Sequence, residues 1–216
     1  MPVRVLLGTS NPAKVNRFCS LLAGYDVEFV TLRQLNITAE PAETGTTPAE
    51  NARCKAEFYG RYFDRVLCND SGLYFLHLPM ADARQPGLNI RSPQGVRLDD
   101  EAMIAYYAAL VHGMGGRVPA AYFDGMAVYN NGTVTHWADT PQTVRHSAFT
   151  MVDAPSPRRY PGWPLDSISV NRAGRYFVDE DLDLAQQTDG EQILLGEYRR
   201  HLIEYLVGAL GLTERT

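Results

Sequence analysis

The sequence predicts an α/β fold, and two observations lead to this prediction. The chain opens with an apolar run at residues 3–7, followed by a small polar loop and a segment of helical periodicity that continues to about residue 22. Further along, strand-like runs at 121–129 and 133–137 are joined by Asn130-Asn131-Gly132, a hairpin signal. A strand–loop–helix unit combined with a later hairpin is typical of a sheet that carries helices.

The composition is that of a globular protein without an electrostatic footprint for nucleic acid. The 216 residues are enough for one large domain or two small lobes, and the hydrophobic and charged fractions, 45% and 21%, are ordinary. A net charge of −5 offers no basic surface for duplex nucleic acid. A small polyanion would therefore need a local basic pocket and a divalent cation.

Cysteine usage and the first residues of the chain predict a reducing compartment of the cell. The three cysteines are widely spaced and form no C-x-x-C pair, which favours free thiols in a reducing environment. Residues 1–4 show no signal-peptide pattern, and no apolar stretch approaches membrane-spanning length. We expect a cytoplasmic protein that binds neither nucleic acid nor a membrane.

The first polar loop, residues 8–14, is a candidate anion site. Asn11 followed by Pro12 is a good helix start, with Asn as the N-cap and Pro at the first helical position. The free N–H groups of such a helix start can bind a phosphate. The polar side chains beside them are Thr9, Ser10, Asn11 and Lys14. The glycine spacing is not that of a Walker loop, and an ordinary polar turn accounts for the same residues equally well.

A second helix start follows at Thr47-Pro48-Ala49-Glu50, which is a capping box. The helix is predicted from Pro48 to about Phe63, with Asn51 and Lys55 on one face near its start. Glu43 lies in the loop just before it. A lone lysine is more often a solvated surface residue, and that alternative remains for Lys55.

The third polar segment is Cys68-Asn69-Asp70-Ser71-Gly72-Leu73. We interpret residues 66–68 as the end of a buried strand, after which Gly72 permits a sharp turn. Asp70 would then lie at the carboxyl end of a strand, where a metal or a polar ligand can reach it. The alternative is a plain turn without a chemical role.

The second half of the chain carries fewer signals. A loop at 86–92 contains Arg91, the acids 99–101 open a helix and are interpreted as capping, and 143–151 is predicted to be a third antiparallel strand. Residues 153–164 are rich in proline and basic side chains, so they form either a linker or a binding loop, and Trp163 favours a binding loop. A final helix is expected at about 191–210.

Four of these segments, in this order, resemble the inosine triphosphate pyrophosphatase family, also called the Ham1 or noncanonical purine NTP pyrophosphatase family. Residues 8–14 are similar to its T/S-x-N-x-x-K loop, and Glu43 with residues 50–56 to its acid followed by E-N-A-x-x-K-A. Residues 69–73 are similar to its D-D-S-G-L turn, and residues 86–91 to its P-G-V-x-S-A-R loop.

The resemblance is weaker beyond residue 100. Residues 161–166 lie where the family has F-G-[YW]-D-P, and only Gly162 and Trp163 match. The family also has a Lys and an S-H-R triplet near its C-terminus, and this sequence contains no clear match to them. Only Arg199 aligns, with the last position of the triplet. Those residues recognise the purine base in the family, so the resemblance does not specify the base. Asn69 replaces the first acid of D-D-S-G, so one carboxylate of the family pattern for metal binding and water activation is absent.

The resemblance implies a long, twisted mixed sheet with flanking helices, in one domain (1–216) of two lobes around a central nucleotide-binding cleft. It also implies a homodimer and a Mg²⁺-dependent (alternatively Mn²⁺-dependent) hydrolase that converts a purine NTP or dNTP, noncanonical bases included, to the monophosphate and pyrophosphate. The catalytic candidates are Asp70, Glu43 and Lys55, and the metal ligands Glu43 and Asp70. The substrate-binding candidates are Thr9, Ser10, Asn11, Lys14, Lys55, Ser71, Gly72, Arg91, Gly162, Trp163 and Arg199.

The residues alone support the same chemistry. Carboxylate oxygens suit Mg²⁺, and lysines together with helix N–H groups suit phosphate oxygens. Two alternatives stay open. The chain could be a divergent relative that acts on another nucleotide in a dedicated pathway, or a nucleotide-binding protein without turnover. The related Maf-type pyrophosphatases share the fold, but their opening motif differs from residues 8–14.

Overall fold

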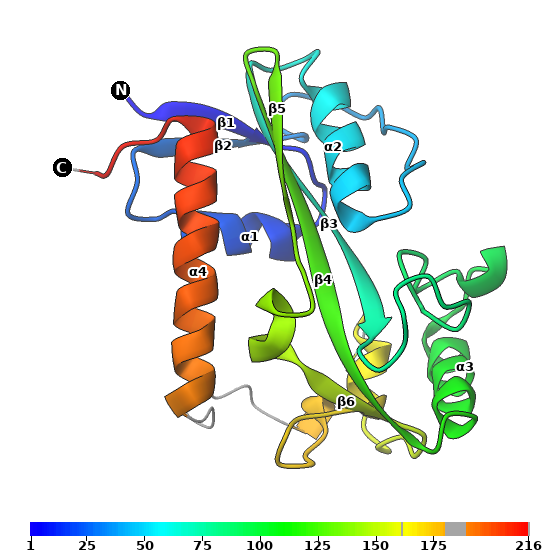
Figure 1. The fold of residues 1–216 in the computed structure, drawn as a ribbon. Helices are drawn as coiled ribbons and strands as arrows, with labels where there is room; N and C mark the ends of the chain where they lie inside the picture. The colour runs from blue at the N-terminus through cyan, green and yellow to red at the C-terminus, as the bar shows by residue number, and fades with distance from the viewer. Residues whose placement is uncertain (161, 180–188, 216) are drawn as a thin grey trace. The chain divides into compact units, whose positions relative to one another are not determined.

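The computed structural model describes residues 1–160, 162–179 and 189–215 (Figure 1). The helices are α1 (Pro12–Leu21), α2 (Pro48–Tyr59), α3 (Asp100–His112) and α4 (Asp189–Leu210). The strands are β1 (Val3–Leu7), β2 (Val27–Thr31), β3 (Arg65–Phe75), β4 (Arg117–Asn130), β5 (Thr133–Ala138), β6 (Phe149–Val152) and β7 (Ser169–Val170). Pro161, the first residue of the segment compared with the F-G-[YW]-D-P motif, lies outside the described residues. Within these ranges no helix combines the length and apolar character needed to cross a membrane.

The strands form one mixed sheet of seven strands in the order β2-β1-β3-β4-β6-β7, with β5 paired to β4. β1 runs parallel to β2 and β3, whereas β4 is antiparallel to β5 and β6. The hairpin between β4 and β5 turns at Asn131 and Gly132, both of which have positive φ. The predicted α/β class with a mixed sheet and flanking helices is confirmed.

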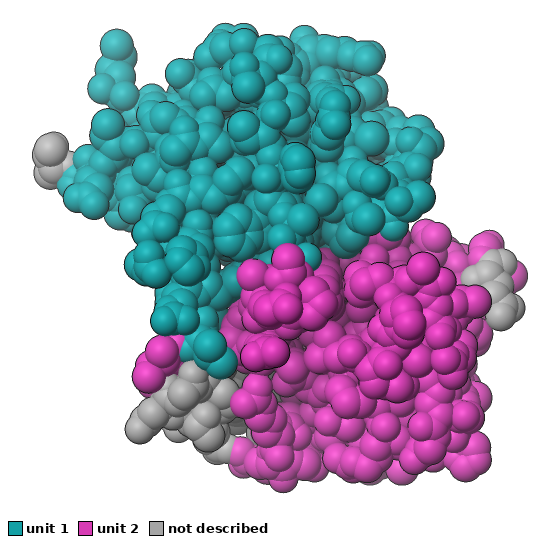
Figure 2. Space-filling view, in the orientation of Figure 1, with its two compact units in different colours: residues 1–71, 124–139, 194–216 teal, residues 72–123, 140–193 magenta. Residues whose placement is uncertain are grey.

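The chain divides into two compact units (Figure 2). Unit 1 comprises residues 1–71, 124–139 and 194–216, and unit 2 comprises residues 72–123 and 140–193. Strands β3 and β4 each contribute to both units.

The core of unit 1 has helices on both faces of its sheet. Successive residues of a strand point to opposite faces, and β1 and β3 follow this rule. Leu7 and Leu67 pack with Phe18 of α1 and with α4, whereas Leu6 and Cys68 pack with α2. By the same alternation, Asn69 and Ser71 point toward the α1 side of β3 and Asp70 toward the α2 side.

The core of unit 2 is built around α3. Met103, Tyr107 and Val111 on one side of this helix are fully or almost fully buried against Met151 of β6 and Ile168 of a short 3₁₀ helix. Asp99 caps α3 by accepting a hydrogen bond from the backbone N–H of Ala102.

Three sequence predictions about elements are wrong. Strand β3 does not end at Asp70 but continues to Phe75, and Gly72 serves close packing, since a Cβ there would lie 2.7 Å from the ring of Tyr74. Helix α2 ends at Tyr59 and is capped by Gly60, short of Phe63. The segment 143–151 is a 3₁₀ helix (Thr143–Ser147) followed by β6.

Candidate functional site

A polar pocket of about 400 Å³ lies within unit 1. Its walls come from the β1–α1 loop, the loop before α2, α2 itself and the middle of β3. The lining residues are Gly8, Thr9, Ser10, Asn11, Lys14, Leu32, Glu40, Pro41, Glu43, Lys55, Tyr59 and Asn69. Three of the segments singled out in the sequence therefore meet in one place.

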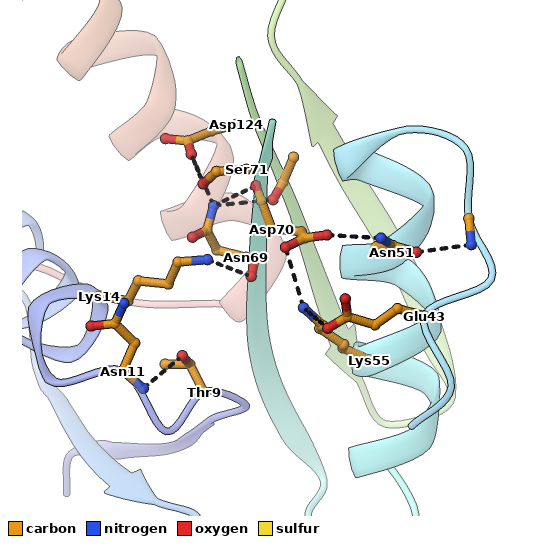
Figure 3. A network of polar contacts seen from close by, with 12 residues as sticks. Thr9, Asn11, Lys14, Glu43, Asn51, Lys55, Asn69, Asp70, Ser71 and Asp124 are labelled. Atoms are coloured by element: carbon orange, nitrogen blue, oxygen red, sulfur yellow. Dashed lines mark hydrogen bonds and ion pairs between the residues drawn. The ribbon is translucent and has the colours of Figure 1, made fainter. Parts of the chain in front are cut away.

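On the α2 side of β3, two carboxylates converge on one lysine (Figure 3). Lys55 Nζ lies 2.7 Å from Glu43 Oε1 and 3.3 Å from Asp70 Oδ1. Burial alone would lower the pKa of Lys55, but the hydrogen bond to Glu43 and the charge of Asp70 outweigh it and raise the pKa. Lys55 is therefore a firmly charged, largely buried ammonium and not a solvated lysine.

Asn51 links the Asp70 carboxylate to the loop that carries Glu43. Its Nδ2 donates to Asp70 Oδ2 at 2.9 Å, and its Oδ1 accepts from the backbone N–H of Gly45 at 2.8 Å. The side chain is only 2% exposed, so its orientation is fixed by packing. Asn51 thus holds Asp70 and the loop that carries Glu43 in register. The sequence contained a signal for this role, because Asn51 shares a helix face with Lys55.

On the opposite side of the pocket, the start of α1 presents donors. Asn11 caps the helix by accepting from Ala13 N–H at 2.9 Å, as the sequence predicted, and its own N–H donates to Thr9 Oγ1 at 3.2 Å. Ser10 and Asn11 are exposed. Lys14 Nζ donates to the backbone oxygen of Asn69 at 3.3 Å, and burial lowers its pKa. A helix start, two small polar side chains and an ammonium are thus available to an anion.

Ser71 and Gly72 follow Asp70 along β3. Ser71 Oγ donates to Asp124 Oδ1 at 2.5 Å, so its proton is already committed within the protein. Asp124 comes from β4 and also pairs with Arg17 of α1. Neither Asp124 nor Arg17 belongs to a motif, and only the pairing of distant strands reveals them. Gly72 belongs to unit 2 and packs against Tyr74.

The remaining candidates are distributed over other parts of the chain. A second pocket, of about 180 Å³, lies within unit 2 and is lined by Arg91, Gly162 and Trp163, among others. Arg91 forms an ion pair of 2.7 Å with Asp100, and Gly162 N–H donates to the same carboxylate at 3.3 Å. The Trp163 side chain is 56% exposed, so it does not pack in the core. Arg199 lies on the exposed side of α4.

The chain is similar to proteins of known family. A dITP/XTP pyrophosphatase of Thermoanaerobacter pseudethanolicus is 35% identical over 77 residues, 35% of this chain and 39% of the relative. The match thus spans about two fifths of that relative's length. A dITP/XTP pyrophosphatase of Halorhodospira halophila is 29% identical over 167 residues, 77% of this chain and 79% of the relative.

Similarity also extends to a solved structure and to a family model. The structure of a HAM1 protein from Coxiella burnetii matches with a TM-score of 0.69 and 20% identity, covering 96% of this chain and 100% of that one, which shows the shared fold. The model of the Ham1 family matches residues 5–143, more than half of the chain and all of the unit 1 pocket. The chain therefore belongs to the Ham1 family.

Proposed function

We propose that this protein is a Mg²⁺-dependent nucleoside triphosphate pyrophosphatase that hydrolyses a purine NTP or dNTP, noncanonical bases included, to the monophosphate and pyrophosphate. The observation that carries the proposal is one pocket of unit 1 that is lined by Glu43, Lys55 and Lys14, with Asp70 in contact with Lys55. The dITP/XTP pyrophosphatase names of its relatives support the reaction class.

The charges of the pocket suit a triphosphate. The phosphate oxygens of a triphosphate need cations and N–H donors at several points. Lys14 and Lys55 would be the cations, and the first turn of α1 would supply the N–H donors. In the reaction, the oxygen of a water molecule forms a bond to the α-phosphorus, and the bond from that phosphorus to the α,β-bridging oxygen breaks. Pyrophosphate leaves with the electron pair of the broken bond, and the water gives up a proton to the solvent. Catalysis of such a step rests mainly on positioning and on neutralising charge.

The donor set fits a hard divalent cation. Glu43 and Asp70 supply carboxylate oxygens, and they already share one cation, the ammonium of Lys55. Among the described residues there is no cluster of three or more His, Cys, Asp or Glu side chains that could hold a metal ion. Two carboxylates, with waters and substrate phosphates completing the shell, are what Mg²⁺ uses, and Mn²⁺ accepts the same donors. A bound Mg²⁺ would neutralise phosphate charge and help to orient the attacking water.

The test is release of pyrophosphate from a panel of nucleoside triphosphates, measured with Mg²⁺, with Mn²⁺ and with a chelator. We expect metal-dependent turnover of at least one purine substrate. Binding without release of pyrophosphate would support the alternative of a nucleotide-binding protein. A preference outside dITP and XTP would support the alternative of a different nucleotide in a dedicated pathway.

Within the same assay, Asp70→Asn tests the metal site. The change is nearly isosteric but removes a negative charge that Mg²⁺ needs, so we expect turnover to be abolished and thermal unfolding to stay near that of the wild type. The matched control is Asp153→Asn, which removes a partly buried acid of unit 2. Near wild-type turnover by the Asp70 variant would show that Asp70 is not a metal ligand.

A further inference from the structure

The surroundings of Asn69 call for a hydrogen-bond donor. Its Nδ2, which has two protons to share, lies 3.0 Å from Asp70 O, 3.2 Å from Gly125 O and 3.3 Å from Asp124 Oδ1. Its Oδ1 has no hydrogen-bond partner among the described residues. Residue 69 is 2% exposed. A carboxylate in the same place would face three acceptors without a proton to give, and one of them carries a negative charge. This environment excludes an ionised acid at position 69, where the resembling motif has one.

Asp124 supplies a carboxylate from the neighbouring strand instead, and this carboxylate is saturated with donors. Its Oδ1 accepts from Ser71 Oγ at 2.5 Å and from Asn69, while its Oδ2 pairs with Arg17 Nη1 at 2.5 Å. The Asp124 side chain is 14% exposed. Burial alone would lower the pKa of Arg17, but the charge of Asp124 and its hydrogen bond raise it. Two donors come from β3 and one from α1.

This arrangement connects to the pocket through α1. Arg17 follows Lys14 by three residues, so the two side chains leave α1 about one turn apart. Fixing Arg17 against Asp124 therefore also fixes the part of α1 that aims Lys14 at the pocket. Figure 3 shows the side chains of Lys14 and Asn69 on the same side of β3. Among the residues that the structure describes, no carboxylate lies within ion-pair distance of Lys14 Nζ.

We propose that Asn69 and Asp124 are a matched pair, in which the carboxylate missing from β3 is carried on β4, and that Asp124 is a positioning residue that holds Lys14 in place through Arg17. The proposal rests on the function proposed above, because it assumes that Lys14 contacts the triphosphate. It also accounts for the departure of this chain from the D-D-S-G pattern: the amide at position 69 is required by the acid at position 124.

The test compares Asp124→Asn, Asn69→Asp and the double variant N69D/D124N. We expect Asp124→Asn to raise KM about tenfold, with a smaller effect on kcat, because a charge-assisted anchor of α1 is lost while Asp70 and Lys55 are untouched. The control is Arg53→Gln, which removes an exposed ion pair with Glu57 on α2 and should change neither parameter.

Asn69→Asp, compared with the double variant, gives a readout that a purely structural role would not move. Its carboxylate would face three acceptors and have no proton to give, so turnover of this variant should fall. In N69D/D124N the amide introduced on β4 can donate to the new carboxylate, so turnover should be higher than in Asn69→Asp. KM should stay as high as in Asp124→Asn, because Arg17 still lacks its carboxylate partner. A double variant no better than Asn69→Asp, or an unchanged KM in Asp124→Asn, overturns the proposal.

Failure of the proposed function would be recognised separately. If the wild-type protein releases no pyrophosphate from any substrate, the pairing of Asn69 with Asp124 is tested by the melting temperature Tm instead. Tm is measured for the wild type, Asp124→Asn, Asn69→Asp and N69D/D124N. A double variant that is more stable than the sum of the two single changes predicts would support the pairing of Asn69 with Asp124. Additive changes in Tm would overturn it.

Discussion

Lys14 and Lys55 line the same pocket, but their surroundings act on their charges in opposite directions. Burial lowers the pKa of Lys14, and the charges of Asp70 and Asp124 only partly offset this effect. For Lys55 the hydrogen bond to Glu43 and the charge of Asp70 outweigh burial, and the pKa is raised. A lysine is charged below its pKa, so on raising the pH Lys14 loses its charge first.

This difference predicts how phosphate binding depends on pH. We expect KM for every nucleotide substrate to rise as the pH increases from neutral toward 10.5, the ordinary lysine value, because Lys14 deprotonates below that value. Lys14→Arg keeps the charge over this whole range and should remove most of the rise. Lys14→Ala should weaken all substrates by similar factors at neutral pH. An effect on one base alone would show that Lys14 does not contact the phosphates.

Some site residues could be predicted from the sequence and others could not, because they depend on contacts of different range. Glu43, Lys55 and Asp70 were accessible, since their types and spacing match a known motif. Asp124 was not, because it lies 53 residues from Ser71 in the sequence and reaches it only through the pairing of β3 with β4. Its neighbours in the sequence give no sign of that role.

At the scale of elements, the loop that carries Trp163 is fixed by the start of α3. Arg159 contacts Glu101 at 2.6 and 3.2 Å, and Gly162 N–H donates to Asp100. The sequence suggested that the acids 99–101 only cap the helix. Asp99 does so, but the next two acids hold loops. Arg159 thus forms an ion pair within unit 2, and Trp163 follows Gly162, whose N–H donates to Asp100.

Trp163 therefore remains a candidate to stack on a base. Base–aromatic stacking is worth roughly 1–3 kcal/mol, so we expect Trp163→Ala to raise KM at least about tenfold. Because the side chain is 56% exposed, Tm should change little. Tyr160→Ala, which removes a 59% exposed ring from the same loop, is the control and should leave KM unchanged. Loss of Tm with unchanged KM would mean that Trp163 is a packing residue.

Helix starts were predicted better than strand ends, for a physical reason. The caps of α1, α2 and α3 each depend on residues two or three positions apart, so Asn11, the Thr47–Glu50 box and Asp99 could be identified locally. The end of β3 depends on its partners in the sheet. Gly72, which is a turn residue by local statistics, lies inside the strand, where the next residue, Leu73, exchanges two backbone hydrogen bonds with Gly87.

At the scale of the whole molecule, the resemblance leads us to expect a homodimer. Sedimentation velocity over a range of concentrations should give a species of twice the mass of one chain. Exposed apolar side chains such as Met80 and Val96 show that apolar surface is available on the single chain. A monomer at every concentration that supports activity would contradict the expectation.

The division of the chain into two units has a consequence for limited proteolysis of the protein. The chain passes between the units at residues 71/72, 123/124, 139/140 and 193/194. The first two points lie within β3 and β4 and the last within α4, so only Asp139–Thr140 lies outside a strand or helix. Strands and helices protect the backbone from proteases, so of these four points Asp139–Thr140 is the one at which we expect cleavage. A cut at that point nicks the protein without freeing either unit, and the two fragments should stay together until they are denatured.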